Sequence, residues 1–185
     1  MGKWLLKNGI KEEDLDWFTH DPEPPDVVGF NMYPIFSHKE IQQGQDKLRF
    51  KVRYGTRTLV EDIGRMYWER YGIPLMLSET ATSGSPQKRI DWLHESMAGV
   101  RSLRSSGVPV LGYTWWPLFA LVSWPYRQGL KDISHYIVQM GLWDLDSDLN
   151  RVETPAAEEF RRVVSEGAAC AGTLDKEPTR RLHAV

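Results

Sequence analysis

The chain has 185 residues, of which 41% are hydrophobic, and a formal net charge of −2. This composition is typical of one soluble globular domain, and the nearly balanced charge gives no reason to expect nucleic acid or an anionic membrane as partner. No apolar run approaches the roughly 18 residues of a membrane span, and a single cysteine, Cys170, excludes an intrachain disulfide and a cysteine-based zinc site.

No metal or other cofactor is expected, because the five histidines show no close metal-ligand spacing. The first ten residues lack the continuous apolar core and the cleavage site of a signal peptide, so we expect a cytoplasmic protein. The unusual number is eight tryptophans. Indole rings usually pack in cores, but they also form platforms for the apolar faces of sugars.

Three segments are expected along the chain. Residues 1–25 are poorly defined, with two short helical pieces and a proline-rich loop at 21–25. Residues 26–166 carry the periodic patterns of a folded domain. Residues 167–185 have little to bury, so we expect a flexible tail.

The folded part opens with a strand over 26–34, which a proline closes. Residues 35–57 show no sustained period, which indicates a long loop with one helical turn at most. Thr58 and Glu61 form a predicted capping box at the start of a helix, and Gly72 is its predicted stop.

Strands and helices continue to alternate after this helix. A short apolar run at 74–79 is too short for a helix and predicts a buried strand. Ser85 is the predicted cap of a helix over 87–105, and a strand over 108–116 follows. After a loop from 117 to about 137 and a short strand or turn at 141–146, Thr154 is the predicted cap of a last helix.

This alternation predicts an α/β fold with a parallel sheet, whose three strands end at one edge. Asn31 and Tyr33 end the first strand, Glu79 ends the second, and Trp115 and Trp116 end the third. Active sites of α/β barrels lie at such carboxyl ends, which favours Glu79 as a catalytic carboxylate. The alternative is that Glu79 has no catalytic role and begins a loop simply because loops are exposed to water.

Three of these segments resemble motifs of glycoside hydrolase family 1, the retaining β-glycosidases. Residues 26–33 are similar to D-F-L-G-x-N-x-Y, the family's sixth strand. Residues 74–80 are similar to its seventh strand, which ends in I-T-E-N-G, and 112–124 to G-Y-x-x-W-S-L-L-D-N-x-E-W of the eighth. The segments around 89–93 and 141–146 also match in order. The resemblance covers roughly 26–165 and implies a partial (β/α)8 TIM barrel, namely its last three strand–helix units.

Carried over residue by residue, the resemblance implies that Glu79 is the nucleophile. Tyr33 would donate a hydrogen bond to it, and Asn31 would line the same pocket. Trp116 would form the floor under the sugar, and Trp124 would contact the sugar's polar edge. Trp115 is a further candidate substrate-binding residue. The alternatives are core packing for each tryptophan, and a tyrosine hydroxyl that points into water.

The sequence also departs from the family's pattern. Ser123 stands where the family has a sugar-binding glutamate, and Ala120 stands at the preceding acidic position, which should weaken or redirect sugar recognition. The family's acid/base carboxylate lies in an Asn-Glu-Pro motif after the fourth strand, and nothing here corresponds. The Glu23-Pro24 pair follows no predicted strand and is a poor match.

Three functions therefore stay open. The first is part of a retaining glycoside hydrolase, which would leave sheet edges to pair with a complementary half-barrel chain or to self-associate. The second is a non-catalytic carbohydrate-binding or interaction protein. The third is a different hydrolase of the same clan, with an aglycone site built by the 35–57 loop.

Overall fold

The computed structural model describes residues 2–36 and 39–171, without the side chains of 168–171. The tail from residue 172 and the side chain of Cys170 therefore lie outside the described residues. Within them, no helix is long and apolar enough to cross a membrane.

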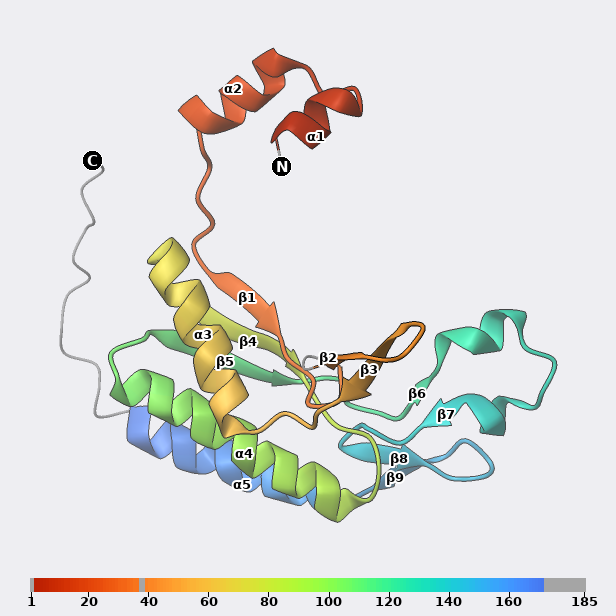
Figure 1. Cartoon of the computed structure of the whole chain (residues 1–185). Helices are drawn as coiled ribbons and strands as arrows, with labels where there is room; N and C mark the ends of the chain where they lie inside the picture. The colour runs from red at the N-terminus through yellow and green to blue at the C-terminus, as the bar shows by residue number, and fades with distance from the viewer. Residues whose placement is uncertain (1, 37–38, 172–185) are drawn as a thin grey trace.

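Helices and strands follow the order in Figure 1, where the colour runs from the first to the last residue. The elements are α1 (Gly2–Lys7), α2 (Glu12–His20), β1 (Val28–Asn31), β2 (Lys39–Gln43), β3 (Leu48–Val52), α3 (Arg57–Tyr71), β4 (Leu75–Thr80), α4 (Pro86–Ser105), β5 (Val110–Trp115), β6 (Leu121–Val122), the 3₁₀ helices η1 (Trp124–Gln128) and η2 (Ile133–Tyr136), β7 (Ile137–Val138), β8 (Trp143–Leu145), β9 (Arg151–Glu153) and α5 (Pro155–Ala171).

The main sheet has the order β1-β4-β5, and both pairs are parallel. Val28 lies opposite Leu75, and Leu75 lies opposite Val110. The helices α3 and α4 provide the two crossovers between these strands. The predicted α/β fold with a parallel sheet is thus confirmed, and its three strands lie side by side in the order of the sequence.

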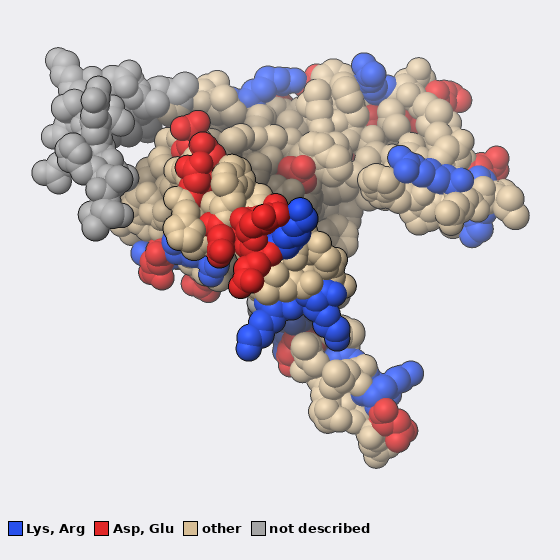
Figure 2. Space-filling view, turned by 90° about the horizontal axis from the view of Figure 1, so that it is seen from above, with Lys and Arg blue, Asp and Glu red and all other residues tan. Residues whose placement is uncertain are grey.

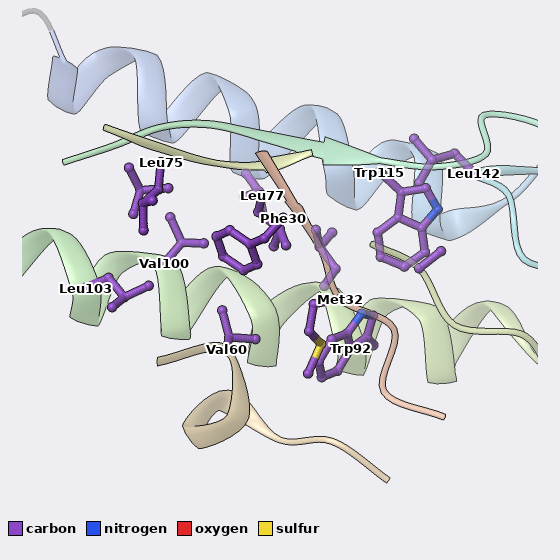
Figure 3. Packing of buried hydrophobic residues seen from close by; sticks show 14 of the residues in the cluster. Phe30, Met32, Val60, Leu75, Leu77, Trp92, Val100, Leu103, Trp115 and Leu142 are labelled. Atoms are coloured by element: carbon purple, nitrogen blue, oxygen red, sulfur yellow. The ribbon is translucent and has the colours of Figure 1, made fainter. Parts of the chain in front are cut away.

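The hydrophobic core lies between this sheet and the helices α3, α4 and α5, as Figure 3 shows for its central residues. Leu77 and Phe30 face the helices and are almost fully buried. The helices α3 and α4 pack closely because glycine stands at their contact. A Cβ atom on Gly99 would lie 2.8 Å from the Cβ of Val60, which leaves no room for a larger residue.

The prediction of a loop over 35–57 is wrong, because the structure has an antiparallel hairpin of β2 and β3 there. Ile41 lies opposite Phe50, so apolar side chains share one face of the hairpin, and both are exposed. The main chain closes the turn, where the N–H of Gly44 bonds to the carbonyl oxygen of Lys47. The alternation of apolar and charged residues is confined to β3, so the sequence of the whole segment shows no sustained period.

The ends of the helices show both confirmed and wrong predictions. The capping box is wrong: α3 begins at Arg57, and Glu61 forms an ion pair of 3.2 Å with Arg57 instead. Gly72 does end α3, in the left-handed conformation at φ 62° that glycine adopts without strain. Ser85 caps α4 by accepting from the N–H of Lys88, and the Thr154 hydroxyl accepts from the N–H of Ala156 at the start of α5.

Other boundaries differ by a few residues. The first strand is shorter than predicted, Val28–Asn31, and α5 continues past Gly167 to Ala171. The expected loop from 117 to 137 contains the β6–β7 ribbon and two 3₁₀ helices, which extend away from the sheet in Figure 1. The helices α1 and α2 form where helical pieces were predicted, and neither has a buried residue.

A buried arginine joins α4 to β8 and to the segment just before it. Arg89 is fully buried, and its guanidinium donates to both carboxylate oxygens of Asp144, at 2.7 and 2.9 Å. It also donates to the carbonyl oxygen of Gly141 at 2.6 Å. This two-pronged geometry is the one in which an arginine–carboxylate pair is strongest.

We expect Arg89→Met to lower the free energy of unfolding by about 3–5 kcal/mol, because it leaves the carboxylate of Asp144 and the carbonyl of Gly141 without their donor. Chemical denaturation followed by circular dichroism would measure this change. The matched control is Arg162→Met, because Arg162 pairs with Glu159 on the surface with its side chain 51% exposed and should matter little. Equal losses in the two variants would contradict the prediction.

Candidate functional site

The carboxyl ends of the three parallel strands are joined by main-chain hydrogen bonds. The N–H of Met32 donates to the carbonyl oxygen of Glu79 at 2.9 Å, and the N–H of Trp116 donates to that of Thr80 at 3.0 Å. Asn31 lies opposite Glu79 in the β1–β4 ladder. The predicted convergence of the strand ends therefore holds, and Glu79 is at its centre.

A hydrogen bond connects the two residues that were predicted to act together. The hydroxyl of Tyr33 donates to Oε2 of Glu79 at 2.9 Å, and both side chains are half-buried. Burial raises the pKa of the Tyr33 phenol, and the hydrogen bond and negative charge of Glu79 raise this pKa further. Tyr33 thus keeps its proton at neutral pH and serves as a donor to the carboxylate.

Asn31 takes part in a different contact. Its Oδ1 accepts a hydrogen bond of 2.9 Å from the hydroxyl of Ser78, and the Asn31 side chain is exposed. The β1–β4 ladder shifts its register between Phe30 and Asn31. Phe30 lies opposite Leu77 and Asn31 lies opposite Glu79, so the pairing skips Ser78. Asn31 therefore lies at the same edge as Glu79.

The three predicted tryptophans lie in two environments. Trp115 is 6% exposed and belongs to the core, where its indole N–H donates to the carbonyl oxygen of Met140 at 3.1 Å. Trp116 and Trp124 are 45% and 74% exposed. Trp115 therefore packs in the core, which was the alternative to sugar binding. The rings of Trp116 and Trp124 are accessible to a ligand.

An open groove of about 380 Å³ lies beside the two exposed tryptophans. Arg127 stacks over the ring of Trp124 at 4.4 Å, which is a cation–π contact. The groove contains no carboxylate, and its hydrogen-bonding side chains include Ser123 at the position where the resemblance would place a glutamate. It is lined by Trp116, Leu121, Val122, Ser123, Trp124, Tyr126 and Arg127.

Sequence reasoning did not identify Tyr126 and Arg127 as groove residues. The Trp-Pro dipeptide at 124–125 gave the only signal, because proline is favoured in the first turn of a helix, and η1 begins there. Residues of this short helix can then face the same groove as Trp124. Among the described residues, no cluster of histidine, cysteine or acidic side chains could hold a metal ion.

Charge is mixed over the surface. Figure 2 shows acidic and basic side chains interspersed on the face seen from above, without a single-sign patch that covers it. This mixture agrees with the formal net charge of −2.

The fold is similar to that of solved β-glycosidase structures. A β-glucosidase from Thermotoga maritima in complex with glucoimidazole matches 86% of this chain with a TM-score of 0.67 and 21% identity. The glycoside hydrolase family 1 β-glucosidase from Exiguobacterium antarcticum matches with a TM-score of 0.66 and 20% identity over 86% of this chain. The β-glycosidase from Thermosphaera aggregans matches 76% of the chain, with a TM-score of 0.59 and 22% identity.

The matched region is only part of each of these proteins. The chain spans 39% of the Thermotoga maritima enzyme, 38% of the Exiguobacterium antarcticum enzyme and 32% of the Thermosphaera aggregans enzyme. No protein-family model matches the sequence, and no curated protein sequence is similar to it. At about 20% identity the likeness shows the fold: an α/β fragment that matches part of the barrel of family 1 β-glucosidases.

We expect Glu79→Gln to lower the pKa of the Tyr33 phenol toward its usual value of 10.0, because the negative charge beside it is removed while its burial remains. A raised phenol pKa stabilises the fold below pH 10, and this contribution is lost as the pH rises above 10. Alkaline titration of tyrosine absorbance, with each protein compared with its Tyr33→Phe counterpart, would measure the shift.

Tyr113 provides the internal control for this titration. Burial raises the pKa of its phenol, and its hydroxyl bonds to that of Ser96 instead of a carboxylate. Its titration should therefore be the same with and without the Glu79 charge. An unchanged Tyr33 titration in Glu79→Gln would show that this carboxylate does not act on Tyr33.

Proposed function

We propose that this chain carries the nucleophile side of a retaining β-glycosidase site, with Glu79 as the nucleophile. The observation that carries the proposal is the 2.9 Å hydrogen bond from Tyr33 to Glu79 at adjoining strand ends. The match of the fold to β-glucosidases supports it. In this proposal β1, β4 and β5 correspond to the sixth, seventh and eighth strands of the barrel.

The chemistry follows from the carboxylate and its donor. An oxygen of Glu79 attacks the anomeric carbon, and the bond from this carbon to the leaving-group oxygen breaks with its electron pair on that oxygen. The product is a glycosyl ester of Glu79, which water then hydrolyses. Tyr33 orients the carboxylate by donating to one oxygen, which leaves the other oxygen for the attack.

The exposed aromatic residues supply a surface for the sugar. Trp116 and Trp124 flank the groove and present flat apolar faces, which suit the C–H faces of a sugar ring. Ser123 offers one hydroxyl where a carboxylate would grip two sugar hydroxyls, so we propose that the preferred sugar differs from an ordinary glucoside.

Retaining hydrolysis also requires an acid/base carboxyl group about 5–5.5 Å from the nucleophile. Glu23 precedes β1 and therefore lies at the amino ends of the strands, whereas Glu79 lies at their carboxyl ends. This placement supports the prediction that Glu23 is not the acid/base. We propose that further strand–helix units supply this group.

The decisive test is covalent labelling of Glu79. We expect an activated 2-deoxy-2-fluoro glycoside to add one fluoroglycosyl group to the chain, since an activated leaving group departs without a general acid. Intact-mass spectrometry would detect the adduct, and peptide mapping would place it on Glu79. A panel of sugars is needed because Ser123 leaves the sugar preference open.

Two variants control the labelling experiment. Glu79→Gln should abolish the adduct, and Glu69→Gln should not change it, since Glu69 is an exposed glutamate on α3. An adduct that persists in Glu79→Gln, or the absence of any adduct across the panel, would overturn the assignment of the nucleophile.

A non-catalytic carbohydrate-binding protein is the second candidate function. The groove favours it, because two exposed tryptophans and Arg127 line the groove without any carboxylate. Sugar binding that Trp124→Ala weakens, together with no adduct on Glu79, would establish this function in place of the first.

We further propose that strand–helix units pair with the outer strands, as a complementary half of the barrel would. Among the described strands, β1 and β5 each pair only with β4 in this sheet. Leu111 on β5 is 59% exposed, and α1 and α2 have no buried residue. Unpaired edges and exposed apolar side chains of this kind favour association.

Without such a partner the purified chain should self-associate reversibly, because the same edges pair with other copies. Sedimentation velocity over a range of concentrations would measure this, and Leu111→Lys should shift the chain toward the monomer. The matched control is Met66→Lys, which changes a residue of 56% exposure on α3 and should have no effect. A strictly monomeric parent chain would contradict the proposal.

A further inference from the structure

The residue directly after Glu79 has a side chain that makes two hydrogen bonds to neighbouring elements. Thr80 is fully buried. Its hydroxyl donates to the carbonyl oxygen of Met32 at 2.6 Å and accepts from the indole N–H of Trp92 at 2.9 Å. One hydroxyl therefore joins β4 to the chain beyond β1 and to the helix α4.

The main chain around Thr80 makes the remaining connections. The carbonyl oxygen of Thr80 accepts from the N–H of Trp116, and that of Glu79 accepts from the N–H of Met32. Met32 immediately precedes Tyr33, so Thr80 holds the backbone next to both members of the Tyr33–Glu79 pair. It also holds the backbone of the exposed Trp116.

Trp92 anchors this arrangement to the core. Its side chain is 1% exposed, and the ring of Tyr54 packs edge-on against it at 6.1 Å. A donor that is held this rigidly fixes the Thr80 hydroxyl in one rotamer, because rotation would leave a buried indole N–H without an acceptor. The hydroxyl's own proton is then directed at Met32.

We propose that Thr80 is the positioning residue that sets the geometry of Glu79 relative to Tyr33 and Trp116. This inference rests on the proposed function, because it concerns the residues that would perform the chemistry. Thr80 does not contact the substrate. It acts by fixing the backbone on both sides of the nucleophile.

The first test compares the rate of Glu79 labelling in three variants. Thr80→Val keeps the shape of the side chain but removes the hydroxyl, and it should slow labelling by about 10- to 100-fold, since a displacement of roughly 1 Å at a reacting group costs up to about 100-fold. Thr80→Ser keeps the hydroxyl and should label at close to the parent rate.

Thr154→Val is the matched control. Thr154 is also buried, and its hydroxyl also makes two hydrogen bonds: it donates to the carbonyl oxygen of Leu142 at 2.6 Å and accepts from the N–H of Ala156 at 3.2 Å. Thr154→Val should lose stability as Thr80→Val does, while its labelling rate stays unchanged. Equal slowing in Thr80→Val, Thr80→Ser and Thr154→Val would show a general loss of packing and would overturn the proposal.

A second measurement separates this proposal from the proposed function. The ¹³Cζ NMR signal of Tyr33 reports the hydrogen bond to Glu79 whether or not the chain is reactive. Thr80→Val should move this signal toward its position in Glu79→Gln, whereas Thr80→Ser and Thr154→Val should leave it in place. If the parent chain forms no adduct but the signal moves in this way, the nucleophile assignment is wrong and the positioning role stands.

An unchanged Tyr33 signal in folded Thr80→Val overturns the positioning role at any level of reactivity. If Thr80→Val does not fold, Thr80→Cys provides the same comparison, because a thiol is of similar size and donates only weakly. Its labelling rate and Tyr33 signal should fall between those of the parent and Glu79→Gln. Parent-like values for both in Thr80→Cys would reject the proposal.

Discussion

Parallel pairing on both sides of β4 brings Tyr33, Glu79 and Trp116 to one edge of the sheet. The strands β1 and β5 run in the same direction as β4, so their carboxyl ends meet at the edge where β4 ends. Glu79 and Thr80 are the last two residues of β4. The first is the carboxylate of the site, and the second binds the neighbouring backbone, so one strand end both carries and supports the candidate chemistry.

Much of the fold could be predicted because its elements begin and end with local signals. Gly72, Ser85 and Thr154 each perform the predicted role at a helix terminus. Tyr33 and Glu79 are 46 residues apart, yet their meeting was predictable from the common edge of parallel strands and from the resemblance to a glycosidase motif.

The remaining features depended on information that local sequence does not contain. In the β2–β3 hairpin only β3 alternates apolar and charged residues, so the segment as a whole shows no sustained period. Thr58 fits a capping pattern in the sequence, but α3 begins at Arg57, so Thr56 occupies the N-cap position. Trp115 and Trp116 are adjacent, and successive side chains of a strand face opposite sides. The sequence alone did not show which of the two faces the core.

The segment between β5 and β8 leaves the sheet and returns to it, and main-chain hydrogen bonds join its two ends. The N–H groups of Leu142 and Trp143 both donate to the carbonyl oxygen of Leu118. The N–H of Ala120 donates to the carbonyl oxygen of Trp143. Arg89 secures the same point through Gly141. The outer part of this segment, residues 122–137, can thus change in length and sequence at little entropic cost to the domain, whereas Met140 belongs to the core. The groove with Trp124 lies on this loop, so the lining of the groove can change in evolution while Glu79 and its sheet stay as they are.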